Sequence, residues 1–284
     1  MTIEKPEKQP NGALVFSAKG FALKDTLDCG QCFRWEEDEK GVFHGVVGNR
    51  SISVSQQGEK LLVERCTPEE WEEFWMDYFD FREDYTVFQR QLSFDPVCCQ
   101  AMELAGGIHI LRQDPWEALC SFIISQNNNI PRIKGIISRL CETWGTPLGE
   151  GRYSFPGWEQ MASLSLEDLA PLRAGFRAKY LLDAARKVQD KTVDFQEIFQ
   201  ADVAQGEQIL RQIQGVGPKV AQCVLLFGFH KMDAFPVDVW MKKVLEAYYP
   251  DGFPEKAKPW AGIAQQYLFH YARLTRLGQK EKLV

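Results

Sequence analysis

The sequence lacks the long apolar segments typical of membrane and secreted proteins. No continuous apolar run reaches about eighteen residues, the length that a membrane-spanning helix needs. The first residues, MTIEKPEKQPNGA, carry charge with no apolar stretch behind it, so no secretory signal is expected. We expect a flexible segment over residues 1–12 and a cytoplasmic protein.

The cysteines lack the spacing of a metal site. Cys29 and Cys32 form one C-x-x-C pair among eight cysteines, and no second pair or histidine cluster completes a zinc site. No cysteine follows Cys223, which excludes a four-cysteine iron–sulfur loop near the C-terminus. We therefore expect free thiols, no metal and no cofactor.

An excess of positive charge is also missing. The chain has 33 Lys and Arg against 39 Asp and Glu, a net charge of −6, whereas a basic domain is the usual sign of nucleic-acid binding. The charge is uneven, because residues 64–84 are strongly acidic and basic residues gather elsewhere. A local basic face is compatible with this pattern. The basic groups are Arg132, Lys134 and Arg139; Arg173, Arg177, Lys179 and Arg186; Lys242 and Lys243.

The chain changes character near Thr67. Short β-prone runs separated by glycine and polar turns precede it, which predicts an antiparallel sheet. Thr67, Pro68 and Glu70 form a helix-start signal, and apolar residues then recur at helical spacing to the end. We predict an α+β fold: an antiparallel sheet domain with a flanking helix over residues 13–95, packed on a larger α-helical domain over residues 96–284.

The segment over residues 209–229, ILRQIQGVGPKVAQCVLLFGF, is the most informative. Gly215, Val216 and Gly217 separate two amphipathic helices, and two glycines allow positive φ angles and leave backbone amides uncovered. Pro218 suits the first position of the second helix. Exposed amides at a helix start bind anions, so we expect this turn to contact a DNA phosphate without reading the base sequence.

This segment resembles the helix-hairpin-helix motif of DNA-repair glycosylases. Lys219 follows the second glycine by two residues, and Asp238 lies downstream in PVDV, as in glycosylases that also cleave the strand. The resemblance implies that Lys219 attacks C1′ of a flipped nucleoside and forms a Schiff base, while Asp238 stabilises positive charge on the sugar. A helix start disfavours the protonated amine, and Asp238 can cap the next helix. Without the joint pattern, Lys219 would be interpreted as a surface lysine and Asp238 as an N-cap.

A second motif, GQCFRW at residues 30–35, resembles the G-Q-x-F-R-W motif of 8-oxoguanine DNA glycosylases. The resemblance implies that the carbonyl of Gly30 accepts a hydrogen bond from N7–H of the lesion. Normal guanine has a lone pair at N7, so the same carbonyl would repel it. The structural alternative is a strand preceded by a turn glycine.

The segment CSFIISQNNNIPRIKGI, residues 120–136, resembles the part of the family that reads the orphaned cytosine. It implies that role for Asn127 and Arg132, and Arg177 matches a second arginine. Phe176 stands where eukaryotic members carry a wedge tyrosine, and an apolar wedge still supplies the bulk that separates stacked bases. The alternative is a helix end followed by a polar turn.

The last amphipathic segment supplies residues for the flipped base. Gln265 and Phe269 are four apart and share a helix face. The resemblance implies that Gln265 contacts the pairing edge of the lesion and that Phe269 and Cys223 contact its two faces. For Phe269 the alternative is core packing. Cys32 replaces a serine of eukaryotic members, and Trp240 replaces a histidine near the phosphate of the lesion, which puts that contact in doubt.

The predicted function is base-excision repair. The chain would be a monomeric DNA glycosylase and abasic-site lyase that excises 8-oxoguanine from duplex DNA, preferably opposite cytosine, with no membrane partner. Its place would be the nucleoid in a bacterium or the nucleus in a eukaryote. The rivals are a related glycosylase for another oxidised base, which commonly carries the absent four-cysteine cluster, a non-enzymatic DNA-binding protein, and more remotely a protein-interaction domain.

Overall fold

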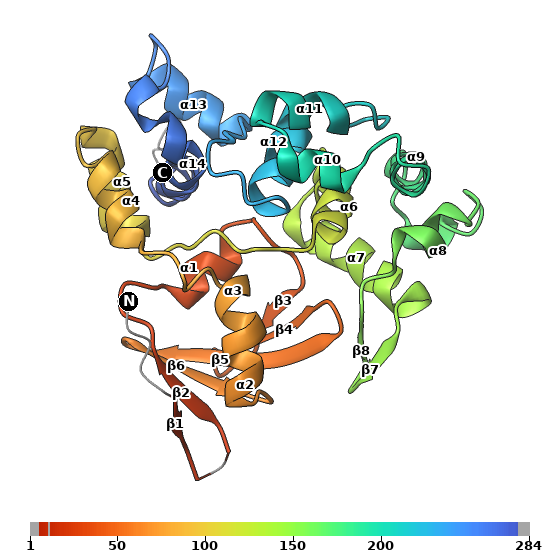
Figure 1. Ribbon diagram of the computed structural model, residues 1–284, viewed down its shortest axis with the longest axis horizontal. Coiled ribbons are helices and arrows are strands. Elements are labelled where there is room, and N and C mark those ends of the chain that lie inside the picture. Colours follow the sequence, from red (N-terminus) through yellow and green to blue (C-terminus); the bar gives the residue numbers. More distant parts are fainter. Residues whose placement is uncertain (1–5, 11, 278–284) are drawn as a thin grey trace, which may run out of the picture.

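The computed structural model describes residues 6–10 and 12–277. Figure 1 shows an antiparallel sheet in the lower half of the view and helices above and around it. The predicted α+β architecture is therefore confirmed. Within the described part of the chain, no helix is both long and apolar enough to cross a membrane.

The sheet has six strands in the order β1-β2-β6-β5-β4-β3, and every neighbouring pair is antiparallel. It begins before residue 13, earlier than predicted, because Glu7 and Lys8 pair with Val15 and Leu14. Residues 1–5 and 11 of the expected flexible segment lie outside the described residues. The strands are β1 (Glu7–Lys8), β2 (Leu14–Ser17), β3 (Trp35–Glu37), β4 (Phe43–Val47), β5 (Arg50–Gln57) and β6 (Lys60–Glu64).

One face of the sheet is covered by a helix that runs from Pro68 to Tyr78. Its first turn, α2 (Pro68–Glu70), is capped by Thr67, whose hydroxyl accepts from the amide of Glu70 at 3.1 Å. The π-helical turn η1 (Trp71–Trp75) and α3 (Met76–Tyr78) follow. Alternate strand residues pack against this helix because successive side chains of a strand point to opposite faces. The sheet core includes Phe16, Ile52, Val54, Leu61, Val63, Trp71 and Trp75.

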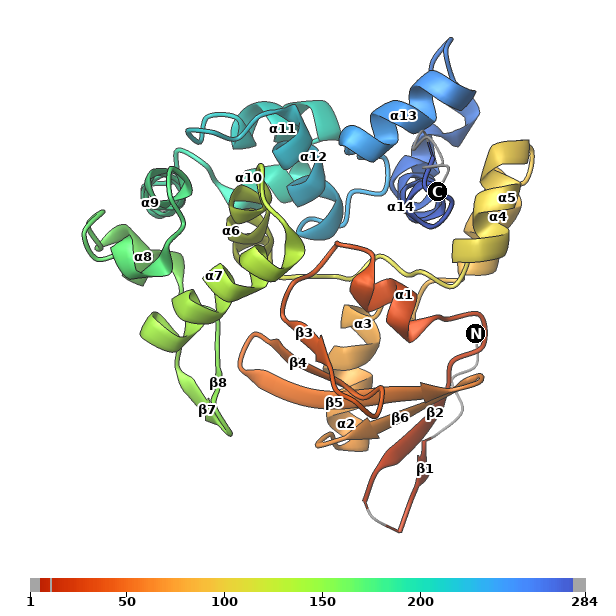
Figure 2. The ribbon, with the colours of Figure 1, turned by 180° about the vertical axis from the view of Figure 1, so that it is seen from behind.

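The remaining helices form a second core, centred on α6 and α12, which pack together. α4 and α5 stand beside α14 in both views (Figure 1; Figure 2), so the predicted domain boundary after residue 95 falls between two helices that join the C-terminal end of the chain. The helices are α1 (Leu23–Asp28), α4 (Tyr85–Leu92), α5 (Pro96–Ala105), α6 (Pro115–Ser125), α7 (Ile130–Trp144), α8 (Trp158–Ala162), η2 (Ala170–Leu172), α9 (Arg177–Gln189), α10 (Phe195–Gln200), α11 (Val203–Leu210), α12 (Pro218–Phe227), α13 (Val239–Tyr248), η3 (Glu255–Trp260) and α14 (Ala261–Leu274); a small hairpin, β7 (Pro147–Gly149) and β8 (Arg152–Tyr153), follows α7.

The GQCFRW segment joins the two cores through Gln31, which is fully buried. Its amide nitrogen donates to the carbonyls of Thr26 and His109, both at 2.8 Å, and its side-chain oxygen accepts from the amide of Leu111 at 2.9 Å. Gln113 donates to the carbonyl of Gln31 at 2.7 Å. These bonds fix both the side chain and the backbone carbonyl of Gln31. The loop between Gly30 and β3 therefore has a fixed conformation.

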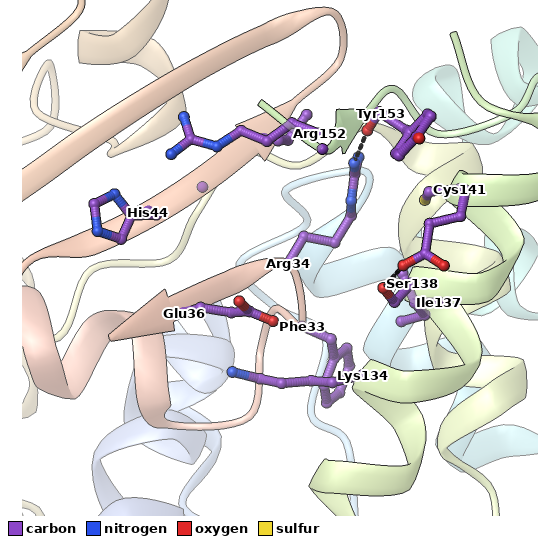
Figure 3. A pocket seen from close by; sticks show the side chains of 14 residues that line it. Phe33, Arg34, Glu36, His44, Lys134, Ile137, Ser138, Cys141, Arg152 and Tyr153 are labelled. Carbon is purple, nitrogen blue, oxygen red and sulfur yellow. Dashed lines mark hydrogen bonds between the residues drawn. The ribbon is translucent and has the colours of Figure 1, made fainter. Parts of the chain in front are cut away.

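Arg34 of the same motif crosses from β3 to the helical domain. It donates to a carboxylate oxygen of Glu117 on α6 at 3.2 Å and to the carbonyl of Tyr153 in β8. Figure 3 shows the contact between Arg34 and Tyr153, which both line a cavity of about 170 Å³ together with Lys134 of α7. Lys134 donates to the carbonyl of Trp35 at 2.5 Å. None of the predicted site residues lines this cavity. The bonds of Arg34 and Lys134 connect the start of β3 to α6 and α7.

Replacement of Arg34 by methionine should therefore cost stability. The side chains of Arg34 and Glu117 are only 9% and 15% exposed, and loss of one partner leaves a buried charge, which costs about 3 kcal/mol. Burial raises the pKa of Glu117, and the charge of Arg34 opposes that shift. Without the arginine the pKa rises further, so the loss should be largest near pH 8 and smaller near pH 5, where the folded protein can protonate Glu117.

Urea unfolding at both pH values measures this difference. The variant Arg50→Met removes an arginine from an exposed pair with Glu70 and should change the free energy of unfolding by less than about 1 kcal/mol. An equal loss for Arg34→Met at pH 5 and pH 8 would contradict the buried-charge explanation.

Candidate active site

The predicted hairpin consists of α11, the turn over residues 211–217, and α12. Gly215 has a φ angle of +79°, and a Cβ there would lie 2.4 Å from the ring of Tyr180, so glycine is required on both counts. The sequence allowed a positive φ angle at both glycines, but Gly217 has an extended conformation with a φ angle of −97°. A Cβ at Gly217 would meet nothing within 4 Å, which leaves the backbone at the start of α12 open to a ligand. Val216 between them is buried.

Residues of α9 hold the hairpin turn from one side. The carboxylate of Asp183 accepts from the amide of Gln214 at 2.6 Å, and Lys187 donates to the carbonyl of Gln212 at 2.5 Å. Asp183 and Lys187 also form an ion pair at 3.0 Å. Side chains of α9 therefore bind two backbone groups of the turn, the amide of Gln214 and the carbonyl of Gln212. The conformation of the hairpin turn depends on these bonds as well as on its glycines.

Lys219 lies in the first turn of α12 and is half-buried. Its Nζ atom is 5.6 Å from the ring centroid of Phe122 on α6. The ring of Phe122 contacts Phe227 at 5.4 Å and Phe33 of the GQCFRW motif at 5.9 Å. The amine of Lys219 therefore lies against the ring of Phe122, which also packs against Phe33 of the GQCFRW motif.

Asp238 caps α13, as its position in the sequence predicts. Its Oδ1 atom accepts from the amides of Trp240 at 2.9 Å and Met241 at 2.8 Å. These two bonds fix the direction of the carboxylate, and the helix start favours its negative charge. Among the described residues, no hydrogen bond uses the second oxygen, Oδ2, so the charge on that atom remains available.

Cys223 connects the two residues, since it lies one turn after Lys219 and is 4% exposed. Burial raises the pKa of the Cys223 thiol; the positive charge of Lys219 opposes this shift and the negative charge of Asp238 adds to it. The charges of Lys219, on α12, and of Asp238, at the start of α13, therefore both act on one buried thiol. The thiols of the C-x-x-C pair, Cys29 and Cys32, are also buried, and burial raises their pKa values, that of Cys29 to about 12.

The residues predicted to inspect the lesion come from α14 and the loop after α1. Gly30 has a φ angle of +86°, a conformation that other residues rarely adopt. Gln265 is 3% exposed, and its side-chain oxygen accepts from Gln266 at 3.3 Å. Phe269 is half-buried under the guanidinium of Arg273, which lies 5.5 Å from its ring centroid.

Two contacts place this loop beside α14. Arg273 donates to the carbonyl of Asp28 at 3.5 Å, and His270 lies 3.6 Å from a carboxylate oxygen of Asp25. Phe33 meets Phe122 beside Lys219 on the other side of the loop. Helix α1, which leads into the Gly30 loop, therefore contacts α14, and Phe33, which follows the loop, contacts the surroundings of Lys219.

The asparagine run forms a sharp turn between α6 and α7. Asn127 has a φ angle of +45° and is exposed. Asn128 donates to the carbonyl of Ile124 at 3.0 Å, and Asn129 caps α7 by accepting from the amide of Arg132 at 3.0 Å. Two of the three asparagines thus shape the turn, and Asn127 presents its side chain to solvent.

Arg177 is 2% exposed and already occupied. Its guanidinium donates to the carbonyls of Gln126 and Asn127, the latter at 2.9 Å, and to the carbonyl of Ala174 at 3.3 Å. Sequence reasoning did not foresee this burial, because these bonds span α6 and α9. A direct contact with a cytosine would require Arg177 to exchange some of these carbonyls. Arg132 is exposed, and its guanidinium makes a 3.5 Å contact with the carbonyl of Arg173.

Phe176 stands at the start of α9 with 47% of its surface exposed. Its ring lies 4.4 Å from the guanidinium of Arg177 and 5.7 Å from the ring of Tyr180. An exposed aromatic side chain beside the Asn127 turn suits a wedge that enters a base stack. Trp240 is half-buried with Lys243 above its ring at 4.5 Å.

Gln222 is a residue that the sequence did not single out. It lies on α12 one turn after Lys219; its side-chain oxygen accepts from the amide of Phe235 at 2.9 Å and its nitrogen donates to Glu207 of α11 at 2.7 Å. Phe235 is three residues before Asp238, so Gln222 fixes the loop that carries this carboxylate to the helix that carries Lys219. At the loop's start, His230 lies 3.3 Å from the buried Asp80 of the sheet domain.

The variant Gln222→Glu should slow base excision about tenfold. Its carboxylate would repel that of Glu207 and lose the donated bond, which loosens the loop before Asp238. The double variant Gln222→Glu with Glu207→Gln exchanges donor and acceptor and should restore most of the rate. Single-turnover excision at saturating enzyme measures the effect, with little change expected in DNA affinity. Failure of the double variant to recover would argue against this positioning role.

Two family models match the chain. The model of the 8-oxoguanine DNA glycosylase N-terminal domain matches residues 13–119, and that of the HhH-GPD superfamily of base excision DNA repair proteins matches residues 120–258. The N-glycosylase/DNA lyase of Saccharomyces cerevisiae is 33% identical over 271 residues, which cover 84% of this chain and 71% of that protein.

Solved structures extend the similarity to the whole fold. MBOgg1 in complex with a low-affinity DNA ligand is 39% identical with a TM-score of 0.89, covering 97% of this chain and 100% of that one. The Clostridium acetobutylicum 8-oxoguanine glycosylase/lyase, bound to DNA with cytosine opposite 8-oxoG, is 36% identical with a TM-score of 0.88 over the same shares of both chains. The resemblance seen in the sequence is confirmed, and the chain belongs to the 8-oxoguanine DNA glycosylase/lyase family of the helix-hairpin-helix superfamily.

Proposed function

We propose that this chain excises 8-oxoguanine from duplex DNA, preferably opposite cytosine, through a Schiff base on Lys219. The observation that carries the proposal is the placement of Lys219 in the first turn of α12, with the carboxylate of Asp238 fixed by two backbone amides and both charges acting on the buried thiol of Cys223. The names of its relatives, N-glycosylase/DNA lyase and 8-oxoguanine glycosylase/lyase, support the same reaction class.

The proposed reaction starts with attack of the Lys219 amine on C1′ of the flipped nucleoside. The C1′–N9 bond breaks, and the departing base takes the bonding electrons and then a proton. Positive charge develops on the sugar, and the carboxylate of Asp238, held by two backbone amides, is the group that would stabilise it. Cleavage of the C1′–O4′ bond, with a proton taken up by O4′, then opens the sugar ring and gives a protonated imine on Lys219. Removal of a proton from C2′ breaks the C3′–O bond, the 3′ phosphate leaves with the bonding electrons, and the strand is cut.

The other predicted residues would bind the DNA around this step. The open backbone of Gly217 and its neighbours would contact a phosphate, while Gly30, Cys223, Gln265 and Phe269 would hold the base. A local basic surface would offset the net charge of −6. The protein would bind as a monomer, which light scattering of the DNA complex would test by its mass.

Reading of the opposite base is proposed for Asn127, Arg132 and Arg177, with Phe176 as the wedge. Asn127 and Arg132 are exposed and can donate to an unpaired cytosine directly. Arg177 would act after it exchanges its bonds to the turn carbonyls. We therefore expect selectivity for cytosine to depend first on Arg132 and Asn127.

Duplexes with one 8-oxoguanine opposite each of the four bases test the function. Base release and borohydride trapping should both occur, and both should be fastest opposite cytosine. Equal rates for all four duplexes would reject the assignment of an opposite-base site. Absence of both base release and adduct, with DNA still bound, would leave a non-enzymatic DNA-binding protein.

A further inference from the structure

A second cavity lies in the sheet domain, apart from the Lys219 site. It encloses about 270 Å³ between the end of β2, the helix over residues 68–78 and the start of α4. Its walls are largely aromatic: Phe16, Trp71, Phe81, Tyr85 and His109. None of the residues assigned to the lesion, the opposite base or the hairpin lines this cavity, so it needs a separate explanation.

His109 is the polar group inside this cavity. It is 6% exposed, and its ring stacks on that of Tyr85 with centroids 3.7 Å apart and planes at 3°. Its Nδ1 atom lies 3.0 Å from the carbonyl oxygen of Phe79, which can only accept, so Nδ1 carries the ring proton. Burial lowers the pKa of His109 to about 4, which keeps the ring neutral at physiological pH.

The second nitrogen of His109, Nε2, therefore carries a lone pair. Among the described residues, no donor bonds to it, while the ring forms part of the cavity wall. The lone pair of Nε2 is therefore free to accept a hydrogen bond. A ligand that fills the cavity and presents an N–H group would satisfy this atom.

The size, walls and rim of the cavity restrict what it can hold. An apolar cavity of about 150 Å³ binds benzene, so 270 Å³ is enough for a bicyclic ring. Aromatic walls favour a flat aromatic ligand through stacked and edge contacts. The rim carries Glu83 and Asp84 against a single lysine, Lys19, which disfavours phosphate-bearing or other anionic ligands.

We propose that this cavity is a binding site for a flat, uncharged, bicyclic heteroaromatic molecule that donates an N–H hydrogen bond to Nε2 of His109. The site is separate from the lesion site, so it can exist whether or not the proposed glycosylase chemistry is correct.

Indole and 1-methylindole are a matched pair of probes, because they have the same ring and only indole has the N–H donor. Calorimetric titration of the full chain at pH 7.5 should give one saturable indole site. The affinity for 1-methylindole should be about five- to tenfold lower, the range for loss of one neutral hydrogen bond. In a long-range ¹H–¹⁵N spectrum, indole should move the Nε2 resonance of His109, one of only four histidines.

Two variants separate this cavity from the lesion site. Ser17 is exposed at the cavity mouth, and Ser17→Trp should fill the cavity and abolish indole binding while DNA cleavage continues. Phe269→Ala, in the proposed lesion site, should leave the affinity for indole unchanged. Binding that survives Ser17→Trp but disappears in Phe269→Ala would overturn the proposal. Equal affinity for both probes with an unmoved His109 resonance would also overturn it, and that measurement needs only the wild-type chain.

Discussion

Replacement of Lys219 by glutamine is expected to eliminate the borohydride-trapped adduct and to slow base release by about a thousandfold or more. Glutamine keeps most of the length and the polarity of the side chain, but its amide nitrogen is not a nucleophile and cannot form an imine. Lys219 is half-buried against the ring of Phe122, and none of the described residues forms an ion pair with it, so the fold should survive. Denaturing gels after borohydride treatment and single-turnover base release measure the two losses.

The matched control for this variant is Lys60→Gln. Lys60 is exposed on β6 of the sheet domain, and its replacement removes one positive charge with no expected effect on adduct formation. Affinity for a lesion-containing duplex should change by no more than a few-fold in either variant. An adduct that persists in Lys219→Gln would mean that another amine is the nucleophile.

The second large effect is expected at Asp238, where asparagine and alanine separate catalysis from capping. Asparagine has nearly the same shape as aspartate, so Asp238→Asn keeps an oxygen that can accept from the amides of Trp240 and Met241 but removes the negative charge. Base excision should fall about a hundredfold or more, because stabilisation of the cationic sugar is lost. The free energy of unfolding should change by less than about 0.5 kcal/mol, since asparagine caps a helix as well as aspartate.

Asp238→Ala should lose both properties. Excision should fall at least as far as in Asp238→Asn, and the protein should also lose about 1 kcal/mol of stability with the cap. Urea unfolding and single-turnover kinetics of the two variants give the comparison. If Asp238→Asn excised the base at the wild-type rate, the carboxylate would be only a helix cap.

The local features of this chain were predictable because they depend on neighbours in sequence. Thr67 and Asp238 accept from amides within three residues of themselves, so a helix start could be recognised from the residue types. The hairpin, with Lys219 in the first turn of α12, follows from glycine and proline placement next to apolar residues at helical spacing.

Other features required contacts between distant residues. The burial of Arg177 depends on carbonyls of the turn between α6 and α7, and the role of Gln222 depends on Glu207 and on the amide of Phe235. The early start of the sheet at Glu7 depends on pairing with β2. The sequence around Arg177 and Gln222 does not show that they are held by distant residues, because arginine and glutamine are common on protein surfaces. The same is true of the two charged residues that form β1.

The order of residues was enough to predict the α+β class and the hairpin, since short-range hydrogen bonds and residue chemistry specify both. The roles of Lys219 and Asp238 are predictions that come from the family resemblance. Folding in three dimensions was needed to let the charges of Lys219 and Asp238 act on the same thiol, that of Cys223, and to leave Gly217 extended and open. It also placed His109 in the wall of an aromatic cavity, where none of the described residues donates a hydrogen bond to Nε2. These properties arise only when elements far apart in the chain pack together and exclude water from the groups between them.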